Sequence, residues 1–262
     1  MKTVVIIPAR WRSTRLKGKV LVDINGKPMI QHVWEKAKEA RSIDDVIVAV
    51  DKERVKKAVE SFGGKAILTS PDHASGTDRL AEVARSVDAD IFINVQADEP
   101  LIHPSMIDSL AQVFQYEKDL QMATLIKRVH NKNEVDDPNV VKVVVDRKGF
   151  ALYFSRSPIP YVRDEGKEQE ITSEGEDGQG ISNRYFKHIG MYSYTKDFLL
   201  TYADLPKSTL EDDEKLEQLR VLEHGYKIKT LETRYNTIGV DTLEDVDKVK
   251  KILLDRLDRR KR

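Results

Sequence analysis

Short runs of apolar, β-branched residues alternate along the first half of the chain with segments in which apolar residues recur every three to four positions. The runs predict strands and the longer segments predict helices, so this half has the β-α-β order of an α/β fold. The runs at residues 4–7 and 91–95 are almost wholly apolar, which is typical of central strands covered on both faces. The expected strands lie at 3–7, 46–50, 66–68 and 91–95, and the expected helices at 29–40, 53–62, 77–87 and 104–116.

The second half has a different pattern. Strands are expected at 122–129, 140–145, 151–153 and 187–194, and helices at 210–224 and 242–258. Residues 164–184 form a Gly- and Glu-rich interruption, most simply a surface loop. We therefore expect an α/β fold in one domain, 1–262, with a mixed central sheet, flanking helices and a subdomain inserted roughly within residues 128–225.

Composition excludes several classes of function. Lys and Arg number 44 and so do Asp and Glu, so there is no overall positive field and we expect no nucleic-acid partner. The chain has no cysteine, which excludes disulfides, thiolate metal sites and cysteine nucleophiles. No apolar run approaches the roughly 18–20 residues of a membrane span, and no signal peptide is recognisable. The expected location is the cytoplasm, with no membrane association.

The loop after the first expected strand is rich in cations. Between Arg10 and Lys19 it holds five cations, two hydroxyl side chains and a glycine, with no acid. A cationic run by itself is usually a solvated loop. This one lies at the carboxyl end of a buried strand, where α/β folds bind ligands, and guanidinium and ammonium groups bind phosphate. The position favours a phosphate site, although neither a Walker A nor a G-x-G-x-x-G motif occurs.

Asp98 follows the apolar strand at 91–95 in the same way. A carboxylate at this place is a suitable ligand for magnesium, which takes one or two protein carboxylates together with substrate phosphates. The alternative is that Asp98 caps a turn or the helix that begins at Pro104. The D-x-D pair Asp88 and Asp90 precedes its strand, at the wrong end of the sheet, and is interpreted as a solvated turn.

Taken together, these segments resemble the cytidylyltransferases that activate the eight-carbon acid sugar 3-deoxy-manno-octulosonate (KDO). The resemblance covers nearly the whole chain, with motifs that include VVIIPAR at 4–10, SGTDRLAEV at 75–83, NVQADEP at 94–100, ALYFSRSPIPY at 151–161, KHIGMYSY at 187–194 and GVDTLEDV at 239–246. It implies a glycosyltransferase-A-like nucleotidyltransferase fold with a small dimerisation subdomain, and therefore a homodimer. It also implies a Mg²⁺-dependent reaction of CTP with KDO to CMP-KDO and pyrophosphate, for lipopolysaccharide synthesis.

The resemblance also implies roles for individual residues. Asp98 and Asp241 would hold magnesium, and Arg15 and Lys19 would act on the triphosphate. The nucleotide would bind against Pro8, Ala9, Arg10, Ser13, Ser75, Gly76 and Arg79. The acid sugar would be selected by Gln96, Arg156, His188, Glu214, Glu217 and Gln218, of which Glu217 and Gln218 stand about 100° apart on one expected helix, so at most one points into the pocket. From the pattern alone, Arg79 could instead be a helix-surface charge and His188 a structural histidine.

The chain departs from the family pattern at Arg12, Lys17, Val20 and Ala97. Ala97 has the largest expected consequence, because the family usually has glycine there. If that position needs a positive φ or a close approach of substrate, the methyl group costs about 1 kcal/mol. Three alternatives stay open: the same chemistry on 8-amino-KDO or a sialic-type acid, a non-catalytic CTP-binding protein, and a glycosyltransferase on the same type of sheet.

Overall fold

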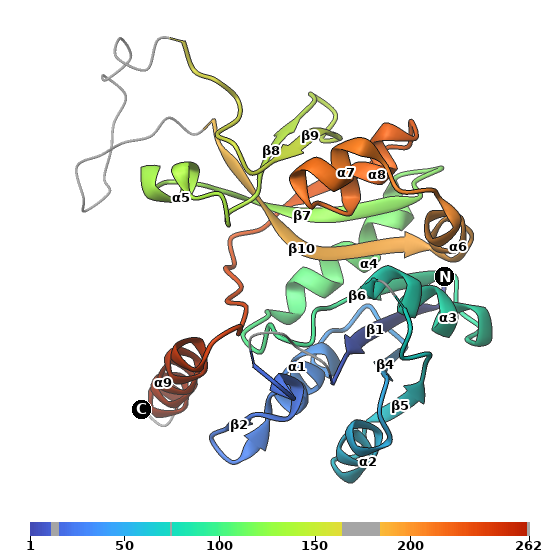
Figure 1. Cartoon of the computed structure of the whole chain (residues 1–262), viewed down its shortest axis with the longest axis vertical. Coiled ribbons are helices and arrows are strands. Elements are labelled where there is room, and N and C mark those ends of the chain that lie inside the picture. The colour runs from blue at the N-terminus through green and yellow to red at the C-terminus, as the bar shows by residue number, and fades with distance from the viewer. Residues whose placement is uncertain (12–15, 74, 164–183, 261–262) are drawn as a thin grey trace. The chain divides into compact units, whose positions relative to one another are not determined.

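The structure, a computed structural model, describes residues 1–11, 16–73, 75–163 and 184–260. The chain divides into two compact units (Figure 1). Unit 1 comprises Met1–Leu120, Gly190–Asp204 and Tyr235–Arg262, and unit 2 comprises Gln121–Ile189 and Leu205–Arg234. Each unit is therefore assembled from chain segments that are not contiguous in sequence.

Unit 1 has the alternating order that the sequence predicts. Its strands are β1 (Thr3–Ala9), β2 (Asp23–Ile24), β3 (Lys27–Pro28), β4 (Asp45–Val50), β5 (Lys65–Leu68), β6 (Ile91–Asn94) and the second half of β10 (Phe186–Thr195). Its helices are the 3-10 helix η1 (Lys19–Leu21), α1 (Met29–Lys38), α2 (Glu53–Ser61), α3 (Gly76–Ser86), α4 (Pro104–Tyr116), α6 (Lys196–Asp204) and α9 (Leu243–Arg260).

The strands of unit 1 form a mixed sheet around β1. Strands β4 and β6 pair with β1 in parallel, β5 pairs with β4 in parallel, and β10 pairs with β6 antiparallel. The register sets Ala9 beside Val50 and Ile6 beside Asn94, so the carboxyl ends of β1, β4 and β6 lie at one edge. The segments that follow these three strands therefore start from the same edge of the sheet, where ligands bind in such folds.

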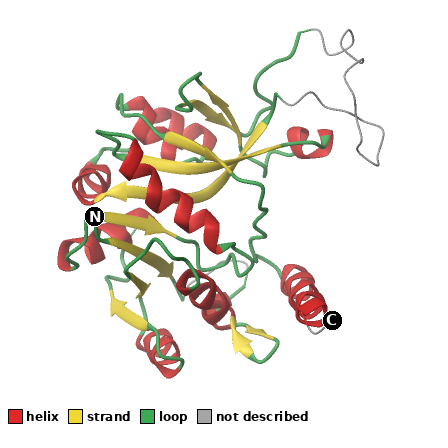
Figure 2. Ribbon diagram, turned by 180° about the vertical axis from the view of Figure 1, so that it is seen from behind, coloured by secondary structure: helices red, strands yellow, loops and turns green. Residues whose placement is uncertain are grey.

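Helices cover both faces of this sheet. Successive residues of β1 point to opposite faces, and nearly all of them are buried. Helices α1 and α3 both contact β1 and β4, with α4 beside α1 and α6 beside α3 (Figure 2). This burial explains the continuous apolar runs in the sequence, since a strand covered on both faces has no solvent-facing side.

Unit 2 is also of mixed α/β composition. It contains β7 (Met122–Arg128), α5 (Lys132–Asp136), β8 (Lys142–Val145), β9 (Ala151–Ser155), the first half of β10, α7 (Thr209–Glu214), α8 (Gln218–Glu223) and β11 (Lys229–Glu232). Strand β11 pairs with β7 in parallel, while β8 pairs antiparallel with both β9 and β10. The surface loop predicted at 164–184 lies outside the described residues apart from Arg184.

One predicted helix is wrong. The sequence favours a continuous helix over 210–224, but the structure has two short helices, α7 and α8, separated at Lys215. Lys215 has a φ of 53° and ends α7 in the left-handed conformation. Apolar periodicity continues through this break because both helices bury one face, so the pattern alone could not reveal it. Glu217 consequently precedes the first turn of α8 and is not a mid-helix residue.

The short elements η1, β2, β3, α5 and β11 and the helix α6 have no counterpart in the sequence prediction. Most are too brief to show a periodicity, and their form depends on tertiary contacts. Among the described residues, no helix combines the length and the apolarity needed to cross a membrane.

Candidate active site

A lysine and two carboxylates meet beyond the carboxyl edge of the unit 1 sheet. Lys19 Nζ donates to Asp98 Oδ2 at 2.6 Å, to Asp241 Oδ1 at 2.9 Å and to the carbonyl oxygen of Val240 at 3.1 Å. The lysine side chain is 14% exposed, and those of Asp98 and Asp241 are 30% and 35% exposed. Burial by itself lowers the pKa of Lys19, but the charge of Asp98 and the hydrogen bonds to both carboxylates outweigh it and hold this pKa above its ordinary value.

Each of the three side chains comes from a different element. Asp98 follows β6, Lys19 opens η1 and Asp241 precedes α9. Asp98 and Asp241 are 241 − 98 = 143 positions apart, and a hydrogen bond from Val240 N to the carbonyl oxygen of Asp98, 2.9 Å long, joins their two segments. The structure thus brings together the two residues that the sequence analysis paired as metal ligands.

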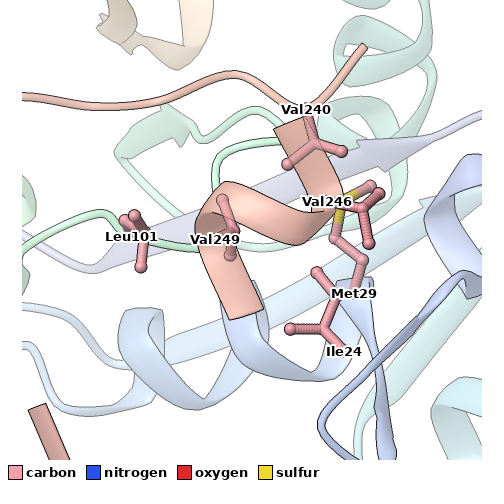
Figure 3. Close-up of a cluster of buried hydrophobic side chains, with 6 residues drawn as sticks. All are labelled: Ile24, Met29, Leu101, Val240, Val246 and Val249. Carbon is pink, nitrogen blue, oxygen red and sulfur yellow. The ribbon is translucent and has the colours of Figure 1, made fainter. Parts of the chain in front are cut away.

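Apolar packing holds these segments in place. Ile24, Met29, Leu101, Val240, Val246 and Val249 form one buried cluster (Figure 3). These residues come from β2, from the start of α1, from the loop after Asp98 and from the segment that enters α9. The cluster lies next to each of the segments that carry Lys19, Asp98 and Asp241. Close packing of its side chains therefore fixes the positions of the three charged groups.

Asp245 supports the turn that carries Asp241. Its Oδ2 accepts hydrogen bonds from the backbone N–H of Asp241 at 3.1 Å, from that of Thr242 at 3.0 Å and from the Thr242 hydroxyl at 2.9 Å. Desolvation by itself raises the pKa of Asp245, but these hydrogen bonds outweigh it and hold this pKa below its ordinary value. The carboxylate therefore stays charged and fixes the first turn of α9.

The donor set fits a magnesium ion. Two carboxylates and a backbone carbonyl are hard oxygen ligands, and the remaining positions of magnesium are commonly filled by water and substrate phosphates. The same three oxygens already converge on one cation, the Lys19 ammonium. No group of three His, Asp or Glu side chains is arranged to hold a metal in the part of the chain that the structure describes, so a metal here would depend on additional ligands.

Glu99 is a neighbour that the sequence analysis overlooked. Burial and the charge of Asp98 raise the pKa of Glu99 to about 8, against a smaller opposing effect of a hydrogen bond with Thr237. Its buried Oε2 has no hydrogen-bond partner among the described residues. Glu99 is therefore largely uncharged at neutral pH, and the negative charge beside Lys19 comes from Asp98 and Asp241.

Arg79 is buried and not a helix-surface charge. The side chain is fully enclosed, and Nη1 donates to the Thr69 hydroxyl. Its Nε and Nη2 have no hydrogen-bond partner in the described part of the chain. Burial, followed by the charge of Arg10, lowers the pKa of Arg79 below its ordinary value. A buried guanidinium with two unused nitrogens favours a ligand that brings acceptor atoms.

The residues expected beside the nucleotide lie near the end of β1. Pro8 and Ala9 end the strand and Arg10 follows it. Ser75 caps α3, since its hydroxyl accepts from Asp78 N at 3.1 Å, and a Cβ placed on Gly76 would stand 3.8 Å from Pro8 Cγ. Gly76 therefore adjoins the strand end. Ser13 and Arg15 lie outside the described residues.

Trp11 anchors the two ends of the cationic loop. The backbone N–H of Trp11 donates to Asp51 Oδ1 at 2.8 Å, and the Trp11 carbonyl oxygen accepts from Gly18 N at 3.2 Å. The Arg54 guanidinium lies 3.8 Å from the centroid of the Trp11 ring. Gly18 has a φ of +69°, and a Cβ there would stand 2.4 Å from Trp11 Cη2. Only glycine fits this contact, and the sequence analysis did not identify Asp51 or Arg54.

Of the residues expected to select the acid sugar, Gln96 lies in unit 1. Its Nε2 donates to the carbonyl oxygen of Gly190 at 3.4 Å. Next to it, Ala97 is buried and is not among the residues with positive φ. The backbone strain that would have made alanine costly at this position is therefore absent.

The other five residues expected to select the sugar lie in unit 2. Glu214 is joined to Arg156 by two hydrogen bonds, from Arg156 N to Oε2 at 2.8 Å and from Arg156 Nε to the Glu214 carbonyl oxygen at 2.7 Å. The buried Lys142 donates to the carbonyl oxygens of Asp137 and Arg156, at 2.9 and 2.5 Å. These contacts make Arg156 and Glu214 one rigid group.

Gln218 is the most enclosed of these five, and His188 is half-buried. His188 Nε2 lies 3.0 Å from the Thr124 hydroxyl, and burial lowers the pKa of His188 to about 3, so its imidazole is neutral at pH 7. Gln218 is buried, and its Nε2 has no hydrogen-bond partner among the described residues. Glu217 is half-buried and stands at the start of α8.

Comparisons with known proteins identify the family of this chain. A family profile described as cytidylyltransferase matches residues 4–228. The protein named 3-deoxy-manno-octulosonate cytidylyltransferase in Geotalea daltonii is 51% identical over 98% of this chain and 100% of its own length. The protein of the same name in Geobacter metallireducens is 50% identical over 95% of this chain and 96% of its own length.

A solved structure shares the fold throughout. It is described as CMP:2-keto-3-deoxy-manno-octonic acid synthetase complexed with CTP, and it matches with a TM-score of 0.89 and 46% identity over 98% of this chain and 100% of that one. A 4-diphosphocytidyl-2C-methyl-D-erythritol synthase from Anaerococcus prevotii, at 11% identity and a TM-score of 0.61, shares the fold alone. The fold is that of the nucleotidyltransferases, and this chain belongs to the cytidylyltransferase family.

Proposed function

We propose that the chain transfers the cytidylyl group of CTP to KDO, giving CMP-KDO for lipopolysaccharide synthesis and releasing pyrophosphate. The observation that carries this proposal is the cluster of Lys19, Asp98 and Asp241 at the carboxyl edge of the sheet. Support comes from relatives named 3-deoxy-manno-octulosonate cytidylyltransferase, which are up to 51% identical over nearly the full length. The three charged groups suit a reaction in which negative charge moves between phosphates.

The reaction is an in-line substitution at the α-phosphorus of CTP. The oxygen of the anomeric hydroxyl forms the new bond to phosphorus, and its proton passes to solvent. The bond from phosphorus to the bridging oxygen breaks, and its electron pair leaves with pyrophosphate. Magnesium held by Asp98 and Asp241 would supply Lewis acidity, which lowers the pKa of the sugar hydroxyl and offsets charge on the α-phosphate.

The chain's own residues bind and orient the nucleotide. Arg10 adds positive charge at the end of β1, and the two unused nitrogens of Arg79 offer hydrogen bonds to acceptors such as cytosine O2 and N3. Because Arg79 is fully enclosed, each of these hydrogen bonds forms in a medium from which water is excluded. Gly76 leaves room beside Pro8 for a base to approach the backbone.

The residues of unit 2 suit a polyhydroxylated acid. Arg156 Nε and Nη1 donate to the carbonyl oxygens of Glu214 and Pro138, at 2.7 and 2.9 Å, and these bonds fix the guanidinium so that Nη2 can meet a substrate carboxylate. His188 acts by hydrogen bonding and not by charge, since its pKa of about 3 leaves the imidazole neutral. The unused Nε2 of the buried Gln218 is a further donor for a hydroxyl. Such a set rejects sugars that leave its polar groups unpaired.

We also propose that the active form is a homodimer in the cytoplasm, where CTP is available. The support for the dimer is the resemblance to the KDO cytidylyltransferases given above. Light scattering coupled to size-exclusion chromatography tests the dimer, and a monomer at all concentrations would refute it.

The test of function is pyrophosphate release from CTP and Mg²⁺ with three acids in parallel: KDO, 8-amino-KDO and a sialic acid. We expect release with KDO. Release with one of the other acids instead would keep the chemistry and change the substrate. Binding of CTP without release with any acid would identify a non-catalytic CTP-binding protein, and consumption of a nucleotide sugar would identify a glycosyltransferase.

A further inference from the structure

Lys19 has no hydrogen left for a phosphate in its observed position. An ammonium group has three N–H donors and no acceptor. All three are used, on Asp98 Oδ2, on Asp241 Oδ1 and on the carbonyl oxygen of Val240. The lysine expected to act on the triphosphate is therefore fully engaged with the residues proposed to hold the metal.

The oxygens around Lys19 are those that a divalent cation would need. Both carboxylates lie within hydrogen-bond distance of the same nitrogen, so a divalent cation held between these two oxygens would stand directly against the ammonium charge. Like charges at such separation repel strongly, because the side chain of Lys19 is 14% exposed and poorly screened by water. Ammonium and metal are alternatives at this position.

We propose that Lys19 is a built-in counter-ion of the carboxylate pair, which leaves the pair when a divalent cation binds and then turns to the triphosphate. This inference rests on the proposed metal site. It predicts that the nucleotide-free chain binds divalent cations weakly, since each binding event must displace Lys19. It also predicts that nucleotide and metal favour each other's binding, because the triphosphate offers acceptors to the displaced ammonium.

The backbone allows this exchange. Lys19 opens η1, where its N–H donates to the Leu16 carbonyl oxygen at 3.1 Å and its own carbonyl oxygen accepts from Val22 N at 3.0 Å. The main chain is thus held while a four-carbon side chain carries the charge. A rotation about side-chain bonds moves the ammonium without unfolding η1.

The first experiment measures Mn²⁺ binding to the nucleotide-free chain by electron paramagnetic resonance. The variants are Lys19→Met and, as the matched control, Lys17→Met. Lys17 lies two positions before Lys19 and is exposed, so this control removes the same charge outside the carboxylate pair. We expect Lys19→Met to bind Mn²⁺ at least about tenfold more tightly than wild type, the factor that a charged hydrogen bond carries. Lys17→Met should stay within about twofold of wild type. Equal affinities for Lys19→Met and wild type would overturn the proposal.

A double variant locates the bound ion. Adding Asp98→Asn to Lys19→Met should remove the gained affinity, because the carboxylate pair is then incomplete. If the gain persists in the double variant, the ion binds elsewhere and the proposal fails. Thermal unfolding provides a second measure, since Mn²⁺ should raise the melting temperature of Lys19→Met more than that of Lys17→Met.

A measurement on the wild-type chain covers the case in which Lys19→Met does not fold. Amines are acylated under limiting reagent and the modified lysines are quantified by mass spectrometry. Adding Mg²⁺ and CTP together should change the acylation rate of Lys19 at least severalfold relative to that of Lys17. An unchanged ratio of the two rates would refute displacement. Pyrophosphate release by wild type tests the proposed function separately. Catalysis is measured with metal and CTP both present, and it does not require that the metal bind weakly when CTP is absent.

Discussion

At the scale of single residues, the site depends on which atoms are already used by their neighbours. Lys19 donates to two carboxylates and a backbone carbonyl oxygen, whereas two nitrogens of the buried Arg79 have no hydrogen-bond partner among the described residues. The first arrangement describes a balanced ionic group, and the second describes a group that still lacks acceptors. Both residues are cations near the carboxyl edge of one sheet. Their burial and the hydrogen bonds that each of them makes distinguish their roles.

Asp98→Asn should reduce turnover at least about a thousandfold while the fold is retained, because a hard anionic ligand becomes a poor neutral one. The measurement is steady-state pyrophosphate release, with circular dichroism to confirm folding. Asp88→Asn is the control, since Asp88 is fully solvated at the opposite end of β6 and should leave turnover unchanged. Wild-type turnover in Asp98→Asn would contradict the proposed metal site.

Gly18→Ala should impair both stability and CTP binding. Alanine at a φ of +69° costs about 1 kcal/mol, and its Cβ would also displace the Trp11 ring, 2.4 Å away. Gly63→Ala is the matched control, because Gly63 has a φ of +84° and no atom within 4 Å of an added Cβ. Urea unfolding and the KM for CTP should show a larger loss for Gly18→Ala. Equal losses would show that the contact with Trp11 is irrelevant.

At the scale of elements, the short helices α7 and α8 show how a buried ion pair specifies a bend. Arg220 Nε and Nη2 donate to the two carboxylate oxygens of Glu211, at 2.7 and 2.6 Å. The chain reverses between them at Lys215, whose positive φ ends α7. Because both charged groups are enclosed, the pair forms only when the helices take this arrangement. The bend in turn determines that Gln218 is buried at the start of α8.

Arg220→Met should destabilise the chain by about 3–5 kcal/mol, since it leaves the Glu211 carboxylate buried without its partner. The double variant Glu211→Met and Arg220→Met should lose less, because no charge is then stranded. Lys56→Met, which removes a surface pair with Glu60 at 3.9 Å, should change the free energy of unfolding by less than about 1 kcal/mol. Urea unfolding measures all three. A larger loss in the double variant than in Arg220→Met would contradict this account.

At the scale of the whole molecule, the site exists because the chain returns to unit 1 after completing unit 2. Residues from Tyr235 onward rejoin unit 1 and carry Asp241 to Lys19 and Asp98. The buried cluster of Val240, Val246 and Val249 with Ile24 and Met29 stabilises that return (Figure 3). Folding of unit 1 is therefore complete only after the last part of the chain is present.

Stability should depend on pH through His188. Its pKa is about 3 in the folded chain and near 6.5 when unfolded, so the unfolded chain binds more protons between these values. The stabilisation from the neutral imidazole is thus fully present above pH 6.5 and is lost as pH falls, by at most about 1.4 kcal/mol per pH unit. Glu99, with a pKa raised to about 8, acts in the opposite sense between pH 4.5 and 8, because there the folded chain binds more protons.

His188→Gln isolates the histidine contribution, because Glu99 is the same in both chains. The destabilisation caused by His188→Gln should shrink by up to about 2 kcal/mol between pH 7 and pH 5. Only wild type loses the stabilisation that the neutral His188 imidazole contributes. Urea unfolding of both chains at the two pH values measures this difference. A constant difference would mean that His188 is protonated as easily in the folded chain as in water.

The sequence predicted the longer strands of unit 1 and most of its helices, though not α6, because strands buried on both faces and amphipathic helices leave periodic patterns. It failed at Lys215, where the left-handed conformation of this residue ends α7 although the apolar period continues into α8. For the site, Asp98 was identifiable from its place after an apolar strand. Asp51, Arg54 and Glu99 were not identifiable. A charged residue is usually on the surface, and the sequence pattern does not show that Asp51 and Arg54 contact Trp11 or that Glu99 lies beside Asp98.

The sequence by itself determined the α/β class, the cationic loop, the exclusion of cysteine chemistry and the resemblance to one family of cytidylyltransferases. Each of these depends on local composition, on periodicity or on ordered motifs. Only the tertiary structure decided that Lys19 bridges Asp98 and Asp241, that Arg79 is buried and that Ala97 is unstrained. These outcomes depend on distances between segments up to 222 positions apart, which burial and packing set and which no local pattern records.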